Sequence, residues 1–325
     1  MINPVIAEVT RGGIVESRHR GAYAVVDRNG HVVQAEGAIA AAVYPRSAVK
    51  AFQCLPVIES GAADRFGFTP EEIALCCSSH NGESDHVRVA GSMLAKAGNA
   101  EDNYECGAHW PAGEVARFDL IRTGHDCGQV HNNCSGKHAG MLALARQIGA
   151  DPHGYTTREH PVQQLIEKTM GDICGVDLRD QPWGIDGCSV PAWAMPLKNL
   201  ALGFAKFRDP EFAPGRRIID AVRANPFMVA GSGDFDTLVM MSVPRVFVKT
   251  GAEGVYCGCV PHAGLGIALK VDDGASRASE VAMASVLANL DVWTVEEQAA
   301  LEGFRHHDLV NWRKFEVGEV RGISL

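Results

Sequence analysis

The sequence lacks the features of a nucleic-acid-binding, membrane-embedded or secreted protein. Its 39 acidic and 30 basic residues give a formal net charge of -9, and an acidic chain disfavours a nucleic-acid partner. No run approaches the roughly 18 apolar residues of a membrane span, and no basic stretch followed by an apolar one opens the chain. We therefore expect a small-molecule partner, no nucleic acid, no membrane and a cytoplasmic location.

Paired CxxC motifs are also missing. The ten cysteines are spread along 325 residues, which does not resemble the short disulfide framework of a small secreted domain. We expect reduced thiols, most of them buried as small apolar side chains. A chemical role for any cysteine must therefore be argued from its neighbours.

Strand-type and helix-type patterns occupy different parts of the chain. Alternating apolar runs occur at 4–12, 23–27, 31–37, 244–251, 254–260 and 264–271, with a hairpin turn expected at Asn29-Gly30. Helical patterns occur between them, at 47–59, 85–97, 135–148, 161–173 and 197–207, and again at 275–290. A further helix should begin after Thr69, with Pro70 in its first turn and Glu72 closing a capping box.

Strands at both ends and helices between them predict an α/β (α+β) fold with one antiparallel sheet. We expect a single catalytic domain over 1–325. Its discontinuous sheet part would span about 1–46 and 244–325, and a helical insertion would span about 47–243.

A serine and a lysine stand three residues apart in "YPRSAVKAF", at Ser47 and Lys50. At this spacing they share a helix face, so the amine can reach the hydroxyl. Serine needs a base to become a nucleophile, and a lysine provides one only when it is uncharged. Taken alone, the pattern also fits an ordinary solvated helix face.

Two later motifs strengthen the catalytic interpretation. Ser79 and Asn81 form an SxN motif after an apolar run, and Lys249 opens a KTG motif at the end of a strand-type run. The order SxxK, SxN, KTG resembles that of the serine β-lactamase and penicillin-binding protein group. The two lysines and Arg46 would crowd positive charge, which favours one uncharged amine. Arg46 is also a candidate ligand for a substrate carboxylate.

Thiols and amines cluster in two other stretches. Cys134, Lys137 and His138 fall on one face of a predicted helix start, and Cys188 follows Asp186 in a glycine-rich loop. Two thiolates and a nitrogen donor suit zinc. A pair of buried structural thiols is the alternative, and the spacing alone leaves both open.

Five stretches together resemble the class 3, rhizobial-type L-asparaginases, a family also called asparaginase II or thermolabile asparaginases. They are "YPRSAVKAFQ", "CSSHNGE", "HNNCSGKHAGML", "GIDGCSVP" and "VKTGAEGV". The resemblance implies a serine β-lactamase and glutaminase-like fold, a homodimer, and hydrolysis of L-asparagine to L-aspartate and ammonia.

The resemblance also implies roles for residues at the matching positions. They are two Ser-Lys tandems, Ser47 with Lys50 and Ser79 with Lys249, and a Zn²⁺ site at Cys134, Lys137 and Cys188, with Asp186 and His138 close by. Because asparagine carries a carboxylate, an ammonium group and an amide, we expect substrate contacts at Arg46, Asp186, His138 and Asn81.

Two other functions remain open at this point. A non-catalytic binder of a polar amino acid would need no paired nucleophile and base. A glutaminase or a penicillin-interacting serine hydrolase would keep the same catalytic pattern, and one methylene of pocket depth separates glutamine from asparagine.

Overall fold

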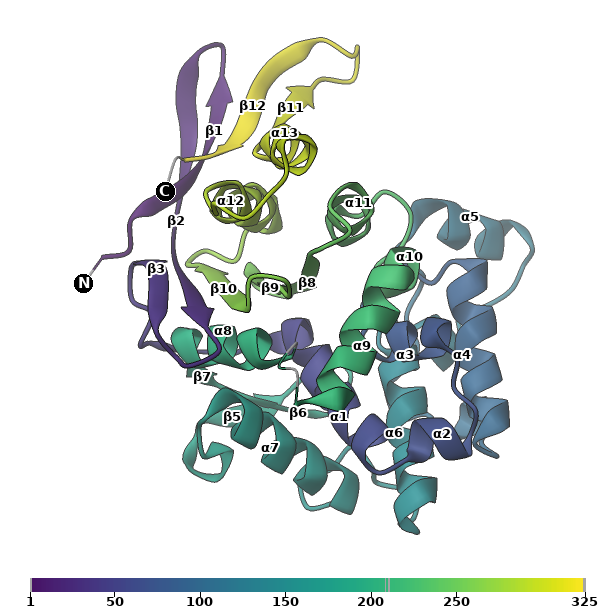
Figure 1. The fold of residues 1–325 in the computed structure, drawn as a ribbon. Coiled ribbons are helices and arrows are strands. Elements are labelled where there is room, and N and C mark those ends of the chain that lie inside the picture. Colours follow the sequence, from purple (N-terminus) through teal and green to yellow (C-terminus); the bar gives the residue numbers. More distant parts are fainter. Residues whose placement is uncertain (1, 208, 210, 324–325) are drawn as a thin grey trace. The chain divides into compact units, whose positions relative to one another are not determined.

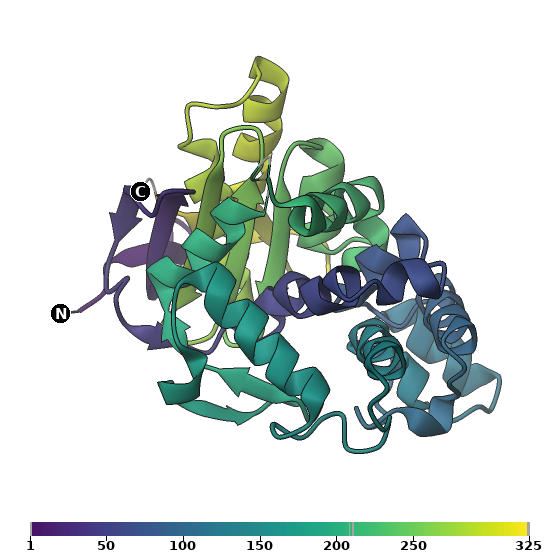
Figure 2. The ribbon, with the colours of Figure 1, turned by 60° about the horizontal axis from the view of Figure 1, so that its bottom comes forward.

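Strands from both chain ends form one antiparallel sheet, as the sequence predicts. The computed structural model describes residues 2–207, 209 and 211–323. The eight-stranded sheet has the order β11-β12-β1-β2-β10-β9-β8, and β3 pairs with β2. Figure 1 shows the topology, and Figure 2 shows the purple N-terminal strands beside the green C-terminal ones. The strands are β1 (Val5–Arg11), β2 (Ile14–Asp27), β3 (Val32–Glu36), β8 (Phe247–Gly251), β9 (Val255–Val260), β10 (Leu265–Val271), β11 (His306–Val310) and β12 (Glu316–Gly322).

The chain divides into two compact units, which we describe separately. The sheet unit comprises Met1–Ala48, Met195–Lys206 and Val239–Leu325, and the helical unit comprises Val49–Ala194 and Phe207–Leu238. The sheet unit thus takes one segment, 195–206, from the middle of the expected insertion. That the chain is a single catalytic domain stays a prediction.

Two helices cover the sheet within the sheet unit. α8 (Leu197–Lys206) packs on β2, β9 and β10, and α12 (Ser276–Ala288) packs on β1, β9, β10 and β12. Figure 1 shows them on opposite faces. The unit also contains α13 (Val295–Phe304), the short pair β4 (Ala42–Val43) and β7 (Met195–Pro196), and the 3-10 turn η1 (Arg46–Val49), whose last residue belongs to the helical unit.

The helical unit is built around α6, whose residues 135–145 are all buried. α6 contacts α1, α2, α3, α4 and α7. The helices and strands of this unit are α1 (Lys50–Glu59), α2 (Ala62–Arg65), α3 (Pro70–Cys76), α4 (Ser84–Lys96), η2 (Glu101–Asn103), α5 (Glu114–Arg122), η3 (Gln129–His131), α6 (Ser135–Ile148), α7 (Pro161–Cys174), η4 (Leu178–Asp180), β5 (Trp183–Ile185), β6 (Pro191–Trp193), α9 (Ala213–Ala224) and α10 (Pro226–Val229), while α11 (Phe235–Ser242) crosses the boundary between the units.

Local signals in the sequence are confirmed where they are strong. Glu72 N–H donates to Thr69 Oγ1 at 3.3 Å, and Thr69 N–H donates to Glu72 Oε2 at 2.7 Å, which completes the capping box. Gly30 has a φ of 88° in the turn between β2 and β3.

The helix expected from residue 47 begins instead as the 3-10 turn η1, and α1 starts at Lys50. Arg46, the first residue of η1, has a left-handed backbone with a φ of 51°.

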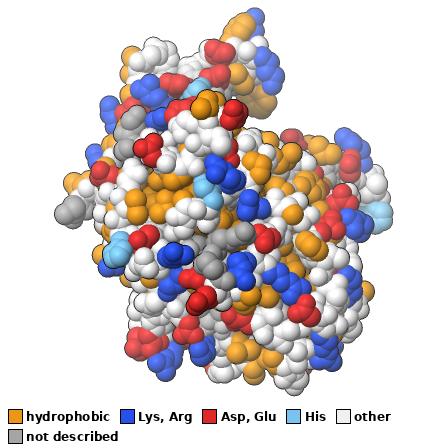
Figure 3. All heavy atoms as spheres, viewed as in Figure 1, with side chains coloured by type: hydrophobic (Ala, Val, Ile, Leu, Met, Phe, Trp, Pro, Cys, Tyr) orange, Lys and Arg blue, Asp and Glu red, His pale blue; other side chains and the backbone are white. Residues whose placement is uncertain are grey.

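Basic and acidic side chains are interspersed on the face drawn in Figure 3. Across the part of the chain that the structure describes, no helix has both the length and the apolar character needed to cross a bilayer.

Close packing of α8 on the sheet depends on a glycine. A Cβ at Gly266 in β10 would lie 1.9 Å from the carbonyl oxygen of Ala201 in α8. We expect Gly266→Ala to lower the free energy of unfolding by about 3 kcal/mol, because the clash is with backbone and cannot be relieved by a rotamer change. Chemical denaturation measures the change.

The matched control is Gly303→Ala in α13, where a Cβ meets nothing within 4 Å. This change should be neutral or stabilising by up to about 1 kcal/mol, because alanine favours helix. Equal stability of the two variants would contradict the packing argument.

Candidate active site

Lys50 and Ser79 are hydrogen-bonded to each other in the helical unit. Lys50 opens α1 and is fully buried. Its Nζ lies 2.9 Å from Ser79 Oγ, 2.5 Å from the carbonyl oxygen of Ser78 and 3.4 Å from that of Asn133. An ammonium group would donate one hydrogen to each of the three.

The same three contacts also suit an uncharged amine. The carbonyls of Ser78 and Asn133 can only accept, so they would take both N–H groups of a neutral lysine. Its lone pair would then face the hydroxyl of Ser79. Lys50 and Ser79 can therefore exchange a proton without any other group moving, which is the arrangement a serine and its base require.

The loop that carries Ser79 is fixed by a second segment of the helical unit. Ser79 N–H donates to the carbonyl of Val229 at 2.9 Å, and Asn81 N–H donates to that of Ala230 at 2.8 Å. Asn81 Nδ2 donates to Asp234 Oδ2 at 2.6 Å. The side chain of Asn81, which we expected to contact substrate, is thus oriented by Asp234, a residue that no sequence motif indicates.

His80 connects the Ser79 loop to the start of α6. Gly82 N–H donates to His80 Nδ1 at 3.0 Å, so the ring proton is on Nε2, which donates to Ser135 Oγ at 2.8 Å. Burial is the main cause that lowers the pKa of His80 well below its ordinary value, and the positive charge of neighbouring groups adds to it. His80 is therefore a neutral structural link.

The remaining catalytic candidates belong to the sheet unit. Ser47 is half-buried in η1 and follows Arg46, whose positive φ is uncommon for a residue with a side chain. Lys249 lies in β8, is fully buried, and donates to the carbonyl of Thr250 at 2.9 Å. A Cβ at Gly251 would come within 2.5 Å of the carbonyl oxygen of Pro45. The end of β8 therefore lies against the turn that carries Ser47.

The three predicted zinc ligands lie together in the helical unit. Lys137 Nζ is 3.0 Å from Cys188 Sγ. A hydrogen bond from the Cys134 thiol lowers the pKa of Cys188 to about 5, helped by the charge of Lys137, and the same bond raises the pKa of Cys134 to about 12. Burial opposes the charge on Lys137, but the negative charge of Cys188, with smaller contributions from Cys134 and Asp186, raises its pKa above the ordinary value.

These residues therefore offer two sulfur atoms and a nitrogen to a metal ion. Among the described residues there is no group of three or more His, Cys, Asp or Glu side chains suited to a metal. The proposed zinc site is not a group of that kind, because its third ligand is the amine of Lys137. Sulfur and nitrogen donors are those that zinc prefers, so the residues fit the ion.

His138 lies one helical turn after Cys134 and is fully buried. Its Nδ1 is 2.7 Å from Tyr155 Oη, while its Nε2 has no hydrogen-bond partner among the described residues. Burial and the charge of Lys137 lower the pKa of His138 to about 3. Tyr155 is a functional candidate that we missed, because it stands in a loop with no recognisable motif.

Asp186 occupies a tight turn before Cys188. Gly187 N–H donates to Asp186 Oδ1 at 2.8 Å, and Ser189 N–H donates to its carbonyl at 2.9 Å. The half-buried carboxylate contributes to the raised pKa of Lys137. It therefore lies close enough to act on the same cluster.

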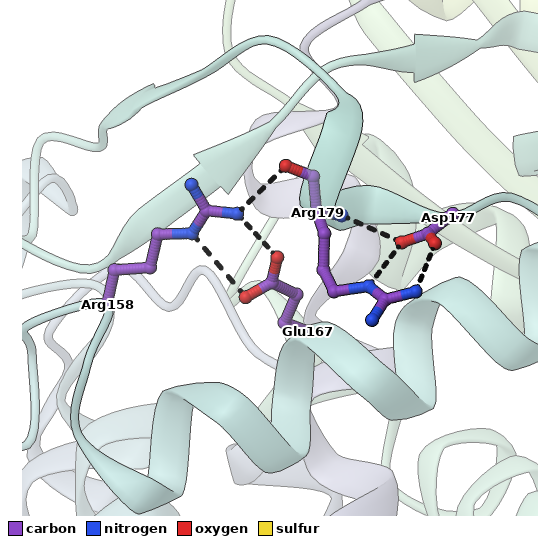
Figure 4. Close-up of polar contacts among 4 residues, drawn as sticks. All are labelled: Arg158, Glu167, Asp177 and Arg179. Atoms are coloured by element: carbon purple, nitrogen blue, oxygen red, sulfur yellow. Dashed lines mark hydrogen bonds and ion pairs between the residues drawn. The ribbon is translucent and has the colours of Figure 1, made fainter.

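A cavity of about 780 Å³ lies elsewhere in the helical unit, along α7 and η4. Charged side chains of its lining form ion pairs (Figure 4): Arg179 binds Asp177, and Glu167 binds Arg158, which is not one of the lining residues. A second cavity of about 760 Å³ is lined by Asn81, Glu83 and residues of α4 and α5. Of these two cavities, only the second is lined by a predicted site residue, Asn81.

Comparison with known proteins agrees with the resemblance in the motifs. The L-asparaginase II family matches the sequence over residues 7–322. The chain belongs to the L-asparaginase II family. The membership supports an amidohydrolase of the asparaginase type acting on a small amide. No curated protein matches this chain in sequence.

Several solved structures have a distantly similar chain path. A β-lactamase (Mb2281c) from Mycobacterium bovis is 12% identical, with a TM-score of 0.45 over 87% of this chain and 94% of its own. Mglu in its native form is 14% identical, with a TM-score of 0.46 over 85% and 66%. D-alanine carboxypeptidase AmpC from Burkholderia cenocepacia is 13% identical, with a TM-score of 0.37 over 87% and 93%.

The lowered pKa of His80 has a consequence for stability. In the unfolded chain this histidine takes up a proton below about pH 6.5, whereas the folded state keeps it neutral, so stability falls as pH falls through that value. The loss due to His80 should reach about 1.4 kcal/mol between pH 7.5 and 5.5.

Between pH 7.5 and 5.5 the free energy of unfolding of the variant His80→Gln should fall by about 1.4 kcal/mol less than that of the parent protein. Urea unfolding at the two pH values measures the difference, and other histidines contribute equally to both proteins. An unchanged pH dependence in the variant would show that His80 is charged in the folded state.

Proposed function

We propose that this protein hydrolyses the side-chain amide of L-asparagine to L-aspartate and ammonia. Membership of the L-asparaginase II family supports the reaction class. The observation that carries the proposal is the contact between buried Lys50 and the hydroxyl of Ser79, because it supplies a serine with a base.

Asparagine is a zwitterion, so its pocket must hold a carboxylate, an ammonium group and the amide under attack. In this proposal Arg46 binds the α-carboxylate and Asp186 binds the α-ammonium. His138 and Asn81 complete the substrate contacts. These roles are expectations from the sequence and from the charges of asparagine.

The proposed chemistry proceeds through an acyl-enzyme. Ser47 is the proposed nucleophile: its oxygen bonds to the amide carbon while its proton passes to neutral Lys50, with Ser79 as relay. Lys50 returns the proton to the departing nitrogen, the C–N bond breaks and ammonia leaves. Water then attacks the ester and releases aspartate. Backbone N–H groups of the turn that carries Ser47 would stabilise the oxyanion.

Lys249 is the proposed partner of Ser79 in the second Ser-Lys tandem. Because Lys50 is hydrogen-bonded to Ser79, Ser79 is also a candidate nucleophile. The geometry of Lys50 thus supports Ser79 as a participant in proton transfer, whether or not it attacks the amide.

Cys134, Lys137 and Cys188 are the proposed ligands of Zn²⁺. Bound there, the ion would supply a positive charge that shapes the pocket and orients the substrate, since two thiolates offset its charge and weaken it as a Lewis acid. Lys137 would have to give up its proton to bind. The homodimer and the cytoplasmic location also remain proposals from the sequence.

Ammonia release from asparagine, glutamine and other small amides tests the function directly. We expect release from asparagine at a higher kcat/KM than from glutamine. Tight binding of asparagine without ammonia would indicate an amino-acid binder. Preference for glutamine would indicate a glutaminase, and covalent labelling by a β-lactam would indicate a penicillin-interacting enzyme.

If Ser47 is the nucleophile, Ser47→Ala should lower kcat by at least about 1,000-fold, because the attacking atom is removed. Ser79→Ala and Lys50→Met should each lower it by about 100-fold or more through the loss of proton transfer. Steady-state ammonia release measures all three.

Ser92→Ala serves as the control. Its hydroxyl is also hydrogen-bonded, to Glu72 at 2.9 Å, but it belongs to α4 and has no proposed role. Activity of Ser47→Ala within tenfold of the parent protein would remove Ser47 from the mechanism.

Cys188→Ser should bind less than about a tenth of the zinc bound by the parent protein, because a thiolate ligand is replaced by a weakly acidic hydroxyl. Elemental analysis of the purified proteins measures the metal. Cys127→Ser, at a half-exposed cysteine outside the cluster, should retain the metal in full.

Removal of the metal by a chelator separates positioning from chemistry. A positioning role predicts weaker substrate affinity after removal. Complete loss of turnover at saturating asparagine, with affinity unchanged, would contradict it.

A further inference from the structure

One ring nitrogen of His138 is buried without a partner. Nε2 is inaccessible to solvent, and no hydrogen bond to it occurs among the described residues. A buried polar atom of this kind costs free energy unless a ligand or water satisfies it. The other ring nitrogen, Nδ1, is held by Tyr155 at 2.7 Å.

The hydrogen bonds of Tyr155 decide which ring nitrogen of His138 carries the proton. Glu105 N–H donates to Tyr155 Oη at 3.0 Å, so that contact uses a lone pair of the phenol. The phenolic hydrogen then has His138 Nδ1 as its acceptor among the described residues. If Nδ1 carried the proton instead, the hydroxyl hydrogen of the fully buried Tyr155 would be left without an acceptor.

The loop around Tyr155 is anchored on both sides of the tyrosine. The carboxylate of Glu105 accepts hydrogen bonds from Gly154 N and from Thr156 Oγ1, each at 2.7 Å. These two residues flank Tyr155 in the chain. Glu105 therefore fixes the tyrosine from both sides and also binds its hydroxyl through the backbone.

We propose that Tyr155 is a positioning residue that donates its hydroxyl hydrogen to His138 Nδ1 and thereby presents Nε2–H of His138 as a donor to an oxygen of the amide substrate. The inference rests on the proposed function and deepens it, because it names the donating atom and the residue that selects it. His138 lies one turn after Cys134 and next to Lys137 on α6, which places it beside the proposed metal ligands.

The proton position can be measured on the metal-loaded parent protein by nitrogen-15 NMR of its histidine rings. We expect His138 to show a protonated Nε2 and an unprotonated Nδ1 that accepts a hydrogen bond. The variant His138→Gln identifies the signal by its loss. A proton found on Nδ1 would overturn the proposal, because Tyr155 would then be an acceptor only.

Two matched tyrosine variants test the effect on substrate. Tyr155→Phe should raise KM for asparagine about 5- to 10-fold with kcat within threefold, since the ring is no longer held in its donating orientation. Tyr104→Phe removes another buried hydroxyl, one that has no partner among the described residues. It should leave both constants within twofold.

Equal effects of the two substitutions, or a loss of kcat alone in Tyr155→Phe, would contradict the positioning role. If Tyr155→Phe does not fold, the NMR measurement on the parent protein still decides the matter. If the parent protein releases no ammonia from asparagine, the proposed function fails, while the proton position on His138 still tests the role of Tyr155.

Discussion

The hydrogen bonding of one buried amine organises the candidate active site. Lys50 is enclosed by two carbonyl oxygens and one hydroxyl, which is a set that both its charged and its uncharged forms can satisfy. A buried lysine without such partners would be strongly destabilising. The two carbonyls, of Ser78 and Asn133, leave Ser79 as the group with which a proton can be exchanged.

α6 connects this amine to the cysteine cluster. Asn133 precedes the helix, Ser135 binds His80 beside Ser79, and Lys137 reaches Cys188. A Cβ at Gly136 would lie 2.3 Å from the carbonyl oxygen of Leu75 at the end of α3, so the helix start can approach only because this residue is glycine. The loop that carries Ser79, the proposed metal ligands Cys134 and Lys137, and His138 are thus held by one buried helix.

The sequence predicts features that local chemistry decides. The capping box at Thr69, the turn at Gly30 and the span of α6 depend on neighbours in the chain, and all three are confirmed. The spacing of Cys134 and Lys137 also places them correctly on one helix face. β11 and β12 were not predicted as separate strands, because β11 is mostly exposed and polar and the two valines of β12 are three residues apart, so neither sequence has the alternation of a half-buried strand.

Contacts between distant segments could not be predicted in the same way. The sequence pairs Lys50 with Ser47, three residues away, whereas the structure gives it a hydrogen bond to Ser79. Asp234 and Tyr155 orient Asn81 and His138 from segments with no motif. The resemblance to asparaginases supplied the candidate roles, and the tertiary contacts show which neighbours orient those side chains.

The sheet order also affects the biosynthesis of the protein. β2 pairs with β1 and β3, which are near it in the chain, but its third neighbour is β10, with Tyr23 opposite Leu269. During synthesis, β2 can therefore pair with β10 only after nearly the whole polypeptide has been made. By then all residues of the helical unit have been synthesised. Nascent chains would expose an open strand edge during this interval, which makes the late stage of synthesis the one most exposed to aggregation.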